Sequence, residues 1–322
     1  FKQKTAYDIM PSLVGSEMCI RDRVIMEKIG LVVDTAGDLP RDIVKEYNIK
    51  EVPFYLYFEG EEDTMYKENV TITPEEFYKI MRHKKKHPRT AQPNMEDYLS
   101  VFEEVIKEGK DKILVMTLSS KFSGSFQSAV LAKEELKKRH PDVKVEIIDT
   151  KSATFGEGIQ QITAAKMIRK GVLSFDEIVK KLKGIREKTN VIFTLEDLYF
   201  FYLGGRLGKG AALMANLMKV KPIMDIEDGE VGPIEKVRGR KKSLVRIVEI
   251  AKERIKDVNK LVVGSPHADC KEDQEFLIHL FRKETGYMGP IYTRIMGTTI
   301  GAHPGPGTTG LCFFEEDLEG LV

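Results

Sequence analysis

The sequence has little of three things that would narrow its function: cysteine, net charge and long apolar runs. Its three cysteines, Cys19, Cys270 and Cys312, lie far apart and form no C-x-x-C pair, which argues against a disulfide framework and favours a reducing cytoplasm. The 51 basic and 50 acidic residues nearly cancel, so the overall charge favours neither nucleic acid nor an anionic membrane as a partner. No stretch approaches ~18 consecutive apolar residues, and we expect no stable membrane insertion.

Motifs for nucleotide, hydrolase and metal chemistry are missing as well. The sequence has no P-loop pattern and no G-x-S-x-G elbow followed by Asp and His in the expected chain order. No cysteine, aspartate or second histidine lies near enough to His303 in sequence to suggest a metal site. We therefore expect no cofactor and no metal.

The first 25 residues need separate treatment. They contain neither a continuous apolar region nor a clean cleavage site, so they make a poor signal peptide. Residues 1–23 resemble the translated read-through of a sequencing adapter, and we expect the natural protein to start at Met26. A genuine disordered leader is the alternative, and it would not change the functional interpretation.

Beyond Met26, strands and helices alternate. Apolar strands are predicted over 28–35, 111–120 and 143–150, with helices over 38–48, 73–81 and 125–140 between and after them. Asp38 is expected near the N-cap of the first of these helices. An aromatic-rich strand is predicted over 51–60, and Phe126, Val130 and Leu131 are expected to form the apolar side of the helix over 125–140. The alternation predicts a parallel sheet sandwiched by helices, in an N-terminal α/β domain over 26–165.

The second half predicts another α/β domain, over 166–322, built on a mixed sheet. A capping box at Ser174 and Glu177 starts one helix, and apolar residues over 213–218 recur at helical spacing. The pair Asp228-Gly229 between two alternating stretches predicts an antiparallel hairpin. The fold class is therefore α/β, with two α/β domains.

The segment "TLSSKFSGSFQSA" (117–129) carries the strongest local signal for binding. A buried strand ends in hydroxyls, passes the Ser123-Gly124-Ser125 turn and enters a helix, whose first N–H groups lack partners within the helix. Such an end, with serine O–H donors beside it, holds an anion without a formal positive charge. The plainer interpretation is a serine that only caps the helix.

Three more positions are candidates for binding. Thr90 precedes a Gln-Pro pair that enforces an extended or turn geometry, although most such threonines are ordinary loop residues. Arg206 lies between glycines, which lets the backbone approach a ligand and aims the guanidinium at a carboxylate or phosphate; an exposed arginine beside a C-cap glycine is the commoner case. Arg238, in "RGRKK" (238–242), marks either an exposed basic edge or a docking site for a phosphate-bearing partner.

The chain closes with "GAHPGPGTTG" (301–310), a loop that restricts the backbone around His303. An imidazole titrates near neutral pH, so a general base, a phosphate-binding group and an incidental loop residue all remain open. Sequence spacing does not decide whether His303 meets the Ser123 turn.

Together these segments resemble the DegV family of bacterial fatty-acid-binding proteins, the acyl-carrying subunits of fatty acid kinase. The resemblance spans about residues 28–316 and rests on seven motifs in family order. They are "VVDTAGDLP", "TAQPN", "LSSKFSGSFQSA", "IIDTKSATFGEG", "LEDLYFFYLGGRLG", "LMKVKPI" and "GAHPGPGTTG".

The resemblance implies a non-catalytic, cytoplasmic protein with a lipid tunnel at the domain junction. The tunnel would hold one long-chain fatty acid such as palmitate or oleate, its carboxylate bound by Thr90 and by the Ser123 turn with Gly124 and Ser125. The region of the head group and of the acyl phosphate would include Arg206 and His303, with Arg238 at the rim. The implied partner is the catalytic subunit of fatty acid kinase, with no role for nucleic acid.

Two departures from the family pattern bear on this reading. The usual Thr-Ser-Gln-Pro is Thr-Ala-Gln-Pro here, at 90–93, and the usual Ser-Gly-Thr is Ser-Gly-Ser, at 123–125. Both proposed carboxylate contacts survive. The alternatives are a stand-alone serine hydrolase or acyl transferase using Ser123 and His303, and a lipid sensor without a kinase partner.

Overall fold

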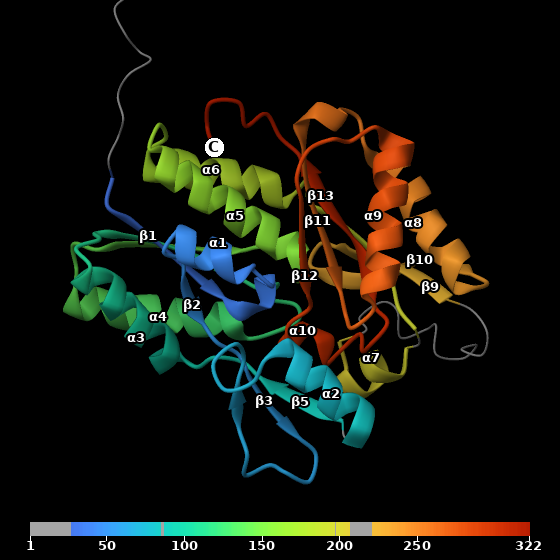
Figure 1. The fold of residues 1–322 in the computed structure, drawn as a ribbon. Coiled ribbons are helices and arrows are strands. Elements are labelled where there is room, and N and C mark those ends of the chain that lie inside the picture. The colour runs from blue at the N-terminus through green and yellow to red at the C-terminus, as the bar shows by residue number, and fades with distance from the viewer. Residues whose placement is uncertain (1–26, 85–86, 197, 207–220) are drawn as a thin grey trace, which may run out of the picture.

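The computed structural model describes residues 27–84, 87–196, 198–206 and 221–322, and its helices and sheets stack in layers (Figure 1). The expected leader over 1–25 and the helix expected around 213–218 lie outside these residues. None of the described helices is both long and apolar enough to cross a membrane.

The first sheet has four parallel strands in the order β2-β1-β6-β7. Helices α3 (Met95–Lys107) and α4 (Ser125–Arg139) pack on one face, and α5 (Phe155–Lys170) and α6 (Phe175–Arg186) pack on the other. The predicted helix-sandwiched parallel sheet is confirmed. Its strands are β1 (Ile29–Asp34), β2 (Lys50–Val52), β6 (Lys112–Thr117) and β7 (Lys144–Asp149).

The second sheet has six strands in the order β10-β9-β8-β13-β11-β12 and is mixed, as predicted. Among the strand pairs of the described residues in this sheet, only β11–β12 is parallel. Helices α8 (Arg240–Arg254) and α9 (Lys271–Thr285) cover its outer face (Figure 1). Its strands are β8 (Asn190–Thr194), β9 (Lys221–Glu227), β10 (Glu230–Val237), β11 (Leu261–His267), β12 (Ile291–Ile295) and β13 (Thr309–Glu315).

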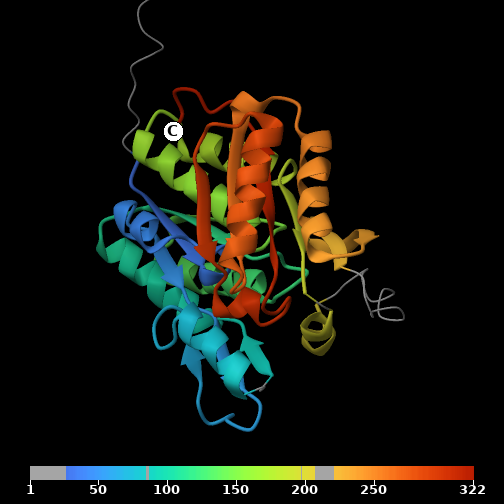
Figure 2. The ribbon, with the colours of Figure 1, turned by 45° about the vertical axis from the view of Figure 1, so that its right-hand side comes forward.

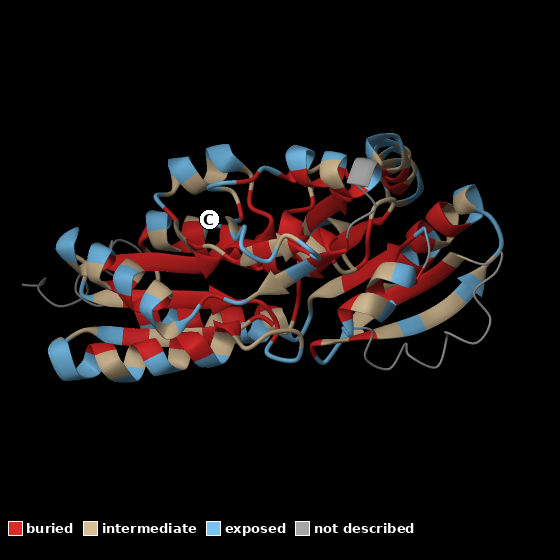
Figure 3. Cartoon of the chain, turned by 90° about the horizontal axis from the view of Figure 1, so that it is seen from below, coloured by how far each residue is buried: buried red, intermediate tan, exposed pale blue. Residues whose placement is uncertain are grey.

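Helix α5 packs against both the first and the second sheet. One apolar core runs from Leu31 and Val33 of β1, through Phe155 and Ile159 of α5, to Phe314 of β13. Figure 3 shows this buried interior running through the stacked layers. The expected domain boundary at residue 165 lies inside α5, and the division into 26–165 and 166–322 stays a prediction.

A third, smaller sheet extends from the first as a lower lobe (Figure 2). Its strands are β3 (Tyr55–Phe58), β4 (Tyr66–Lys67) and β5 (Pro88–Ala91), covered by α2 (Pro74–Lys84). The single strand predicted over 51–60 is therefore wrong. Pro53 has no N–H to give to a ladder, and at this point the chain leaves the first sheet after β2 and enters the small sheet as β3.

The expected apolar side of α4 is also wrong. Leu131 is exposed and Phe126 and Val130 are half-buried, whereas the buried side consists mainly of small residues. Small side chains allow a close approach of α4 to the sheet and to α3, so size and not hydrophobicity decided the buried face. The buried residues of α4 are Ser125, Ser128, Ala129, Ala132 and Leu136.

Candidate functional site

A cavity of about 340 Å³ lies where the first sheet, the small sheet and the second sheet meet. Its wall combines the turn after β6, strand β5, the β9–β10 hairpin, helix α7 (Tyr199–Gly204) and the segment from α10 (Thr298–Gly301) to Thr308. Most of the lining is apolar, as in typical ligand pockets of this size. The apolar lining residues are Phe54, Ala91, Leu118, Phe122, Ala153, Phe193, Phe201, Ile226, Val231, Met296, Ile300 and Pro304.

Four of the residues singled out in the sequence meet in this cavity. Thr90 comes from β5, Ser123 from the turn before α4, Arg206 from the end of α7, and His303 from the loop after α10. They come from positions as far as 213 residues apart in the chain. The cavity is therefore apolar along most of its wall and polar where these four side chains gather.

His303 and Thr90 form a hydrogen bond, with Nε2 and Oγ1 3.1 Å apart. Burial, followed by the positive charges at Arg206 and His87, lowers the pKa of His303 to about 3. The imidazole is therefore neutral at physiological pH and carries no positive charge for an anion in the ligand-free cavity. Its other ring nitrogen, Nδ1, is buried with no partner among the described residues.

The Ser123 turn is held in place by Gln92, whose importance the sequence did not reveal. The Gly124 N–H donates to Gln92 Oε1 at 2.8 Å, and the Ser125 N–H donates to Ser123 Oγ at 3.2 Å. A Cβ atom at Gly124 would lie 2.5 Å from the Gln92 carboxamide, so any other residue there would displace the Gln92 side chain from the turn. The "TAQPN" motif thus supplies three cavity residues, Thr90, Ala91 and Gln92.

Ser125 has a different place from the one expected. It is fully buried and does not line the cavity. Its hydroxyl donates to Asp34 Oδ2 at 2.7 Å and lies 2.7 Å from the Tyr98 hydroxyl. Asp34 also accepts the Leu118 N–H at 3.0 Å, so this carboxyl group joins β1, the end of β6 and the start of α4. We therefore withdraw Ser125 as a carboxylate contact: it fastens the turn that presents Ser123.

The two arginines singled out differ in position. The Arg206 guanidinium reaches the cavity, where Nη1 donates to Gly204 O at 2.7 Å and Nε to Phe122 O at 3.4 Å. Among the described residues it has no carboxylate partner. Arg238 is exposed just after β10 and does not line the cavity.

The glycines around His303 allow close packing instead of leaving space for a ligand. A Cβ atom at Gly305, where φ is +78°, would lie 2.2 Å from the Phe200 ring. A Cβ at Gly204 would lie 2.4 Å from His303 Nδ1. The loop after α10 and helix α7 therefore touch through glycine on both sides, which fixes the ring of His303 against α7.

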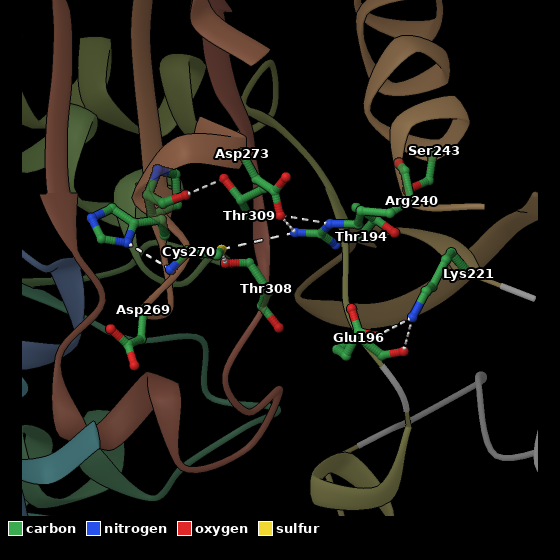
Figure 4. Close-up of polar contacts among 12 residues, drawn as sticks. Thr194, Glu196, Lys221, Arg240, Ser243, Asp269, Cys270, Asp273, Thr308 and Thr309 are labelled. Carbon is green, nitrogen blue, oxygen red and sulfur yellow. Dashed lines mark hydrogen bonds and ion pairs between the residues drawn. The ribbon is translucent and has the colours of Figure 1, made fainter. Parts of the chain in front are cut away.

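Arg240, in the basic segment "RGRKK", belongs to a polar cluster separate from the cavity (Figure 4). Its guanidinium pairs with Asp273 at 2.8 Å and lies 3.8 Å from Cys270 Sγ. The Cys270 thiol donates to Thr308 O, and burial raises its pKa to about 11, so it is not a reactive thiolate. Lys221 and Glu196 form an ion pair nearby.

Residues 28–316 match a family model described as "Uncharacterised protein, DegV family". The chain belongs to the DegV family. Its DegV relatives include a protein named "Fatty acid-binding protein" from Thermotoga maritima, 33% identical over 88% of this chain and 96% of the relative.

Solved structures of similar proteins agree with the fold. A fatty-acid-binding DegV protein from Thermus thermophilus superposes with a TM-score of 0.83 at 27% identity, covering 90% of this chain and 100% of that one. A stearic-acid-binding protein from Eubacterium ventriosum gives 0.81 at 26% identity, covering 90% and 98%. The family resemblance read from the sequence is confirmed.

Proposed function

We propose that this DegV protein binds one long-chain fatty acid, such as palmitate or oleate, in the 340 Å³ cavity. The observation that carries the proposal is the meeting of Thr90, Ser123, Arg206 and His303 in an otherwise apolar cavity. Apolar walls suit an acyl chain, since each buried CH₂ contributes ~0.8 kcal/mol. The names of the Thermotoga, Thermus and Eubacterium relatives, which describe fatty acid binding, support the same ligand class.

Ser123 and Thr90 have hydroxyl hydrogens to offer a carboxylate. Ser123 Oγ accepts the Ser125 N–H, which leaves the serine hydrogen free. If neutral His303 donates from Nε2 to Thr90 Oγ1, the threonine hydrogen is free as well. A buried carboxylate needs such donors, because burying it unpaired is costly.

We further propose that the protein is the non-catalytic subunit of a fatty acid kinase system. A carboxylate oxygen of the bound acid would attack the γ-phosphorus of ATP held by the kinase subunit, giving acyl phosphate and ADP. Arg206 supports this role, because only backbone carbonyls hold its guanidinium among the described contacts, and a fork of N–H donors suits an added phosphate. The chain would then carry the acyl phosphate onward.

The serine hydrolase alternative finds less support. A Ser-His pair needs an acidic group to orient the histidine, but His303 Nδ1 has no partner in the described part of the chain, and Nε2 faces Thr90. The lipid-sensor alternative shares the binding step and differs only in lacking the kinase partner.

Native mass spectrometry of the purified protein, followed by lipid extraction, tests the binding step. We expect one fatty acid per chain. A delipidated protein that takes up neither palmitate nor oleate would rule the proposal out.

Two variants separate the head-group roles. We expect Ser123→Ala to raise the Kd for palmitate about fivefold to tenfold, because one hydrogen bond to the carboxylate is lost. Arg206→Ala should change the Kd little and should lower acyl phosphate formation with a partner kinase by at least about tenfold. Equal loss of palmitate binding in both variants contradicts this division, and turnover of an activated ester that disappears in Ser123→Ala would favour the hydrolase.

A further inference from the structure

Glu68, just after β4, is a fully buried acidic residue that no sequence motif pointed to. Its carboxyl group accepts four hydrogen bonds. Oε2 accepts from the hydroxyls of Thr35 at 2.6 Å and Thr299 at 2.7 Å. Oε1 accepts from the Thr298 hydroxyl at 3.0 Å and from the Thr299 N–H at 2.8 Å.

Three of these four donors belong to the start of α10, some 230 residues along the chain from Glu68. The first N–H groups of a helix have no partner within it, so an acceptor from elsewhere must supply one. The same short segment continues to Ile300 and His303, which line the cavity, and the His303 N–H donates to Ile300 O at 3.0 Å. Glu68 therefore fixes the backbone from which His303 reaches Thr90.

The contact to Thr299 also affects the cavity wall directly. Thr299 lines the cavity, but its hydroxyl is engaged by Glu68. What the residue offers to a ligand is then its methyl group. The backbone must come close for this arrangement: a Cβ atom at Gly297 would lie 2.3 Å from Glu68 Oε1.

We propose that Glu68 is a positioning residue for the ligand cavity, which holds His303 against Thr90 and keeps the wall at Thr299 apolar. The proposal rests on the proposed fatty acid binding. Glu68 itself does not line the cavity, so it acts through α10. The polar end of the cavity therefore depends on the contact between Glu68 and the start of α10, which are about 230 residues apart in sequence.

Glu68→Gln tests the proposal, because the amide keeps the length of the side chain but replaces one acceptor oxygen with an NH₂ group. That group cannot accept from the Thr299 N–H or from a threonine hydroxyl. We expect the Kd for palmitate, measured by displacement of a fluorescent fatty acid, to rise about tenfold. We also expect the imidazole ¹⁵N resonances of His303, assigned with His303→Gln, to move in the ligand-free protein.

Two further variants keep the result interpretable. Thr299→Val keeps the methyl group but removes one donor to Glu68, and should move the His303 resonances in the same direction by less. Leu277→Ala, on the buried side of α9, should lower the Tm while leaving the palmitate Kd and the His303 resonances unchanged.

The proposal is overturned if Glu68→Gln and Thr299→Val both leave the Kd and the His303 resonances at their wild-type values. It is equally overturned if Leu277→Ala produces the same changes as Glu68→Gln. Where Glu68→Gln fails to fold, Thr299→Val decides alone. A wild-type protein that binds no palmitate would count against the proposed function, while the His303 resonances would still report whether Glu68 positions that ring.

Discussion

The hydroxyl groups around the cavity divide by their hydrogen-bond partners. Thr299 and Thr308 give their hydroxyls to Glu68 and to Pro304 O, so both present mainly carbon to the cavity. Thr90 and Ser123 instead pair with His303 and the Ser125 N–H, and both keep a hydrogen for a ligand when His303 Nε2 donates to Thr90. By residue type the four hydroxyls are equal, but their partners separate the two engaged within the protein from the two that we propose bind the carboxylate.

Gly204→Ala tests the close contact between α7 and His303. The added Cβ would lie 2.4 Å from His303 Nδ1, so the ring or the helix must shift and the Thr90 bond must weaken. We expect the palmitate Kd to rise about tenfold. Gly184→Ala in α6 is the control, because a Cβ there meets nothing within 4 Å and alanine is favoured within a helix. A Gly204→Ala protein that binds palmitate like Gly184→Ala would show that the contact does not matter for binding.

At the scale of elements, the β9–β10 hairpin of the second sheet contacts the turn that follows β6 of the first sheet. Its tip, Asp228-Gly229, has φ values of +49° and +82°, which fits the hairpin predicted from these two residues. The Ser119 hydroxyl, just beyond β6, donates to Gly229 O at 2.8 Å. Ile226 and Val231 flank the tip and line the cavity. The hydrogen bond therefore holds this wall of the cavity against the turn after β6.

Gly229→Ala should disturb this contact. The residue would be strained at φ +82°, and its Cβ would lie 2.5 Å from Ser119 Oγ. We expect the free energy of unfolding to fall by about 1–2 kcal/mol and bound fatty acid to dissociate faster. Chemical denaturation and a fatty acid exchange assay measure the two effects. Ser119→Ala removes the hydrogen bond without backbone strain, so faster exchange in both variants, with the larger stability loss in Gly229→Ala, is the expected pattern; unchanged exchange in both contradicts it.

The sequence predicted the helices and strands better than it predicted which elements pack against one another. Alternating strands and helices predicted the parallel sheet, and the Asp228-Gly229 pair predicted the antiparallel hairpin of the mixed sheet, because periodicity and turn type depend on nearby residues. The face of α4 and the division of 51–60 between two sheets depended on packing with distant segments, which periodicity does not encode. The site followed the same rule: Thr90, Ser123, Arg206 and His303 lie in recognisable motifs, whereas the contacts of Gln92 with Gly124 and of Glu68 with Thr299 exist only in the fold.

At the scale of the whole molecule, buried carboxyl groups join distant parts of the chain. Asp38 was expected near the N-cap of α1 (Arg41–Glu46), and its Oδ1 instead accepts the Gly297 N–H at 2.6 Å, across 259 residues of sequence. Pro40 occupies the N-cap position instead. Burial first, and the nearby Glu68 second, raise the pKa of Asp38 to about 7.

This shift makes stability depend on pH. Between about pH 4 and pH 7 the unfolded chain releases the Asp38 proton while the folded protein keeps it, so stability falls as the pH rises through this window, by at most ~1.4 kcal/mol per pH unit. Asp38→Asn cannot titrate, keeps an acceptor for Gly297 and tolerates the φ of +53°. We expect the decline of Tm from pH 5 to pH 7.5 to be shallower in this variant. An identical slope in both proteins would show that Asp38 ionises normally when folded.

Helix α5, shared by the two sheets, has a consequence for how this chain can be divided. A cut near residue 165 would leave each half with an open sheet face, since the first sheet and the second sheet use the same helix for cover. We therefore expect that neither half folds alone, and that expressing them as separate fragments yields insoluble protein. The cavity is lost with either half, because its lining residues come from segments before and after α5 in the sequence.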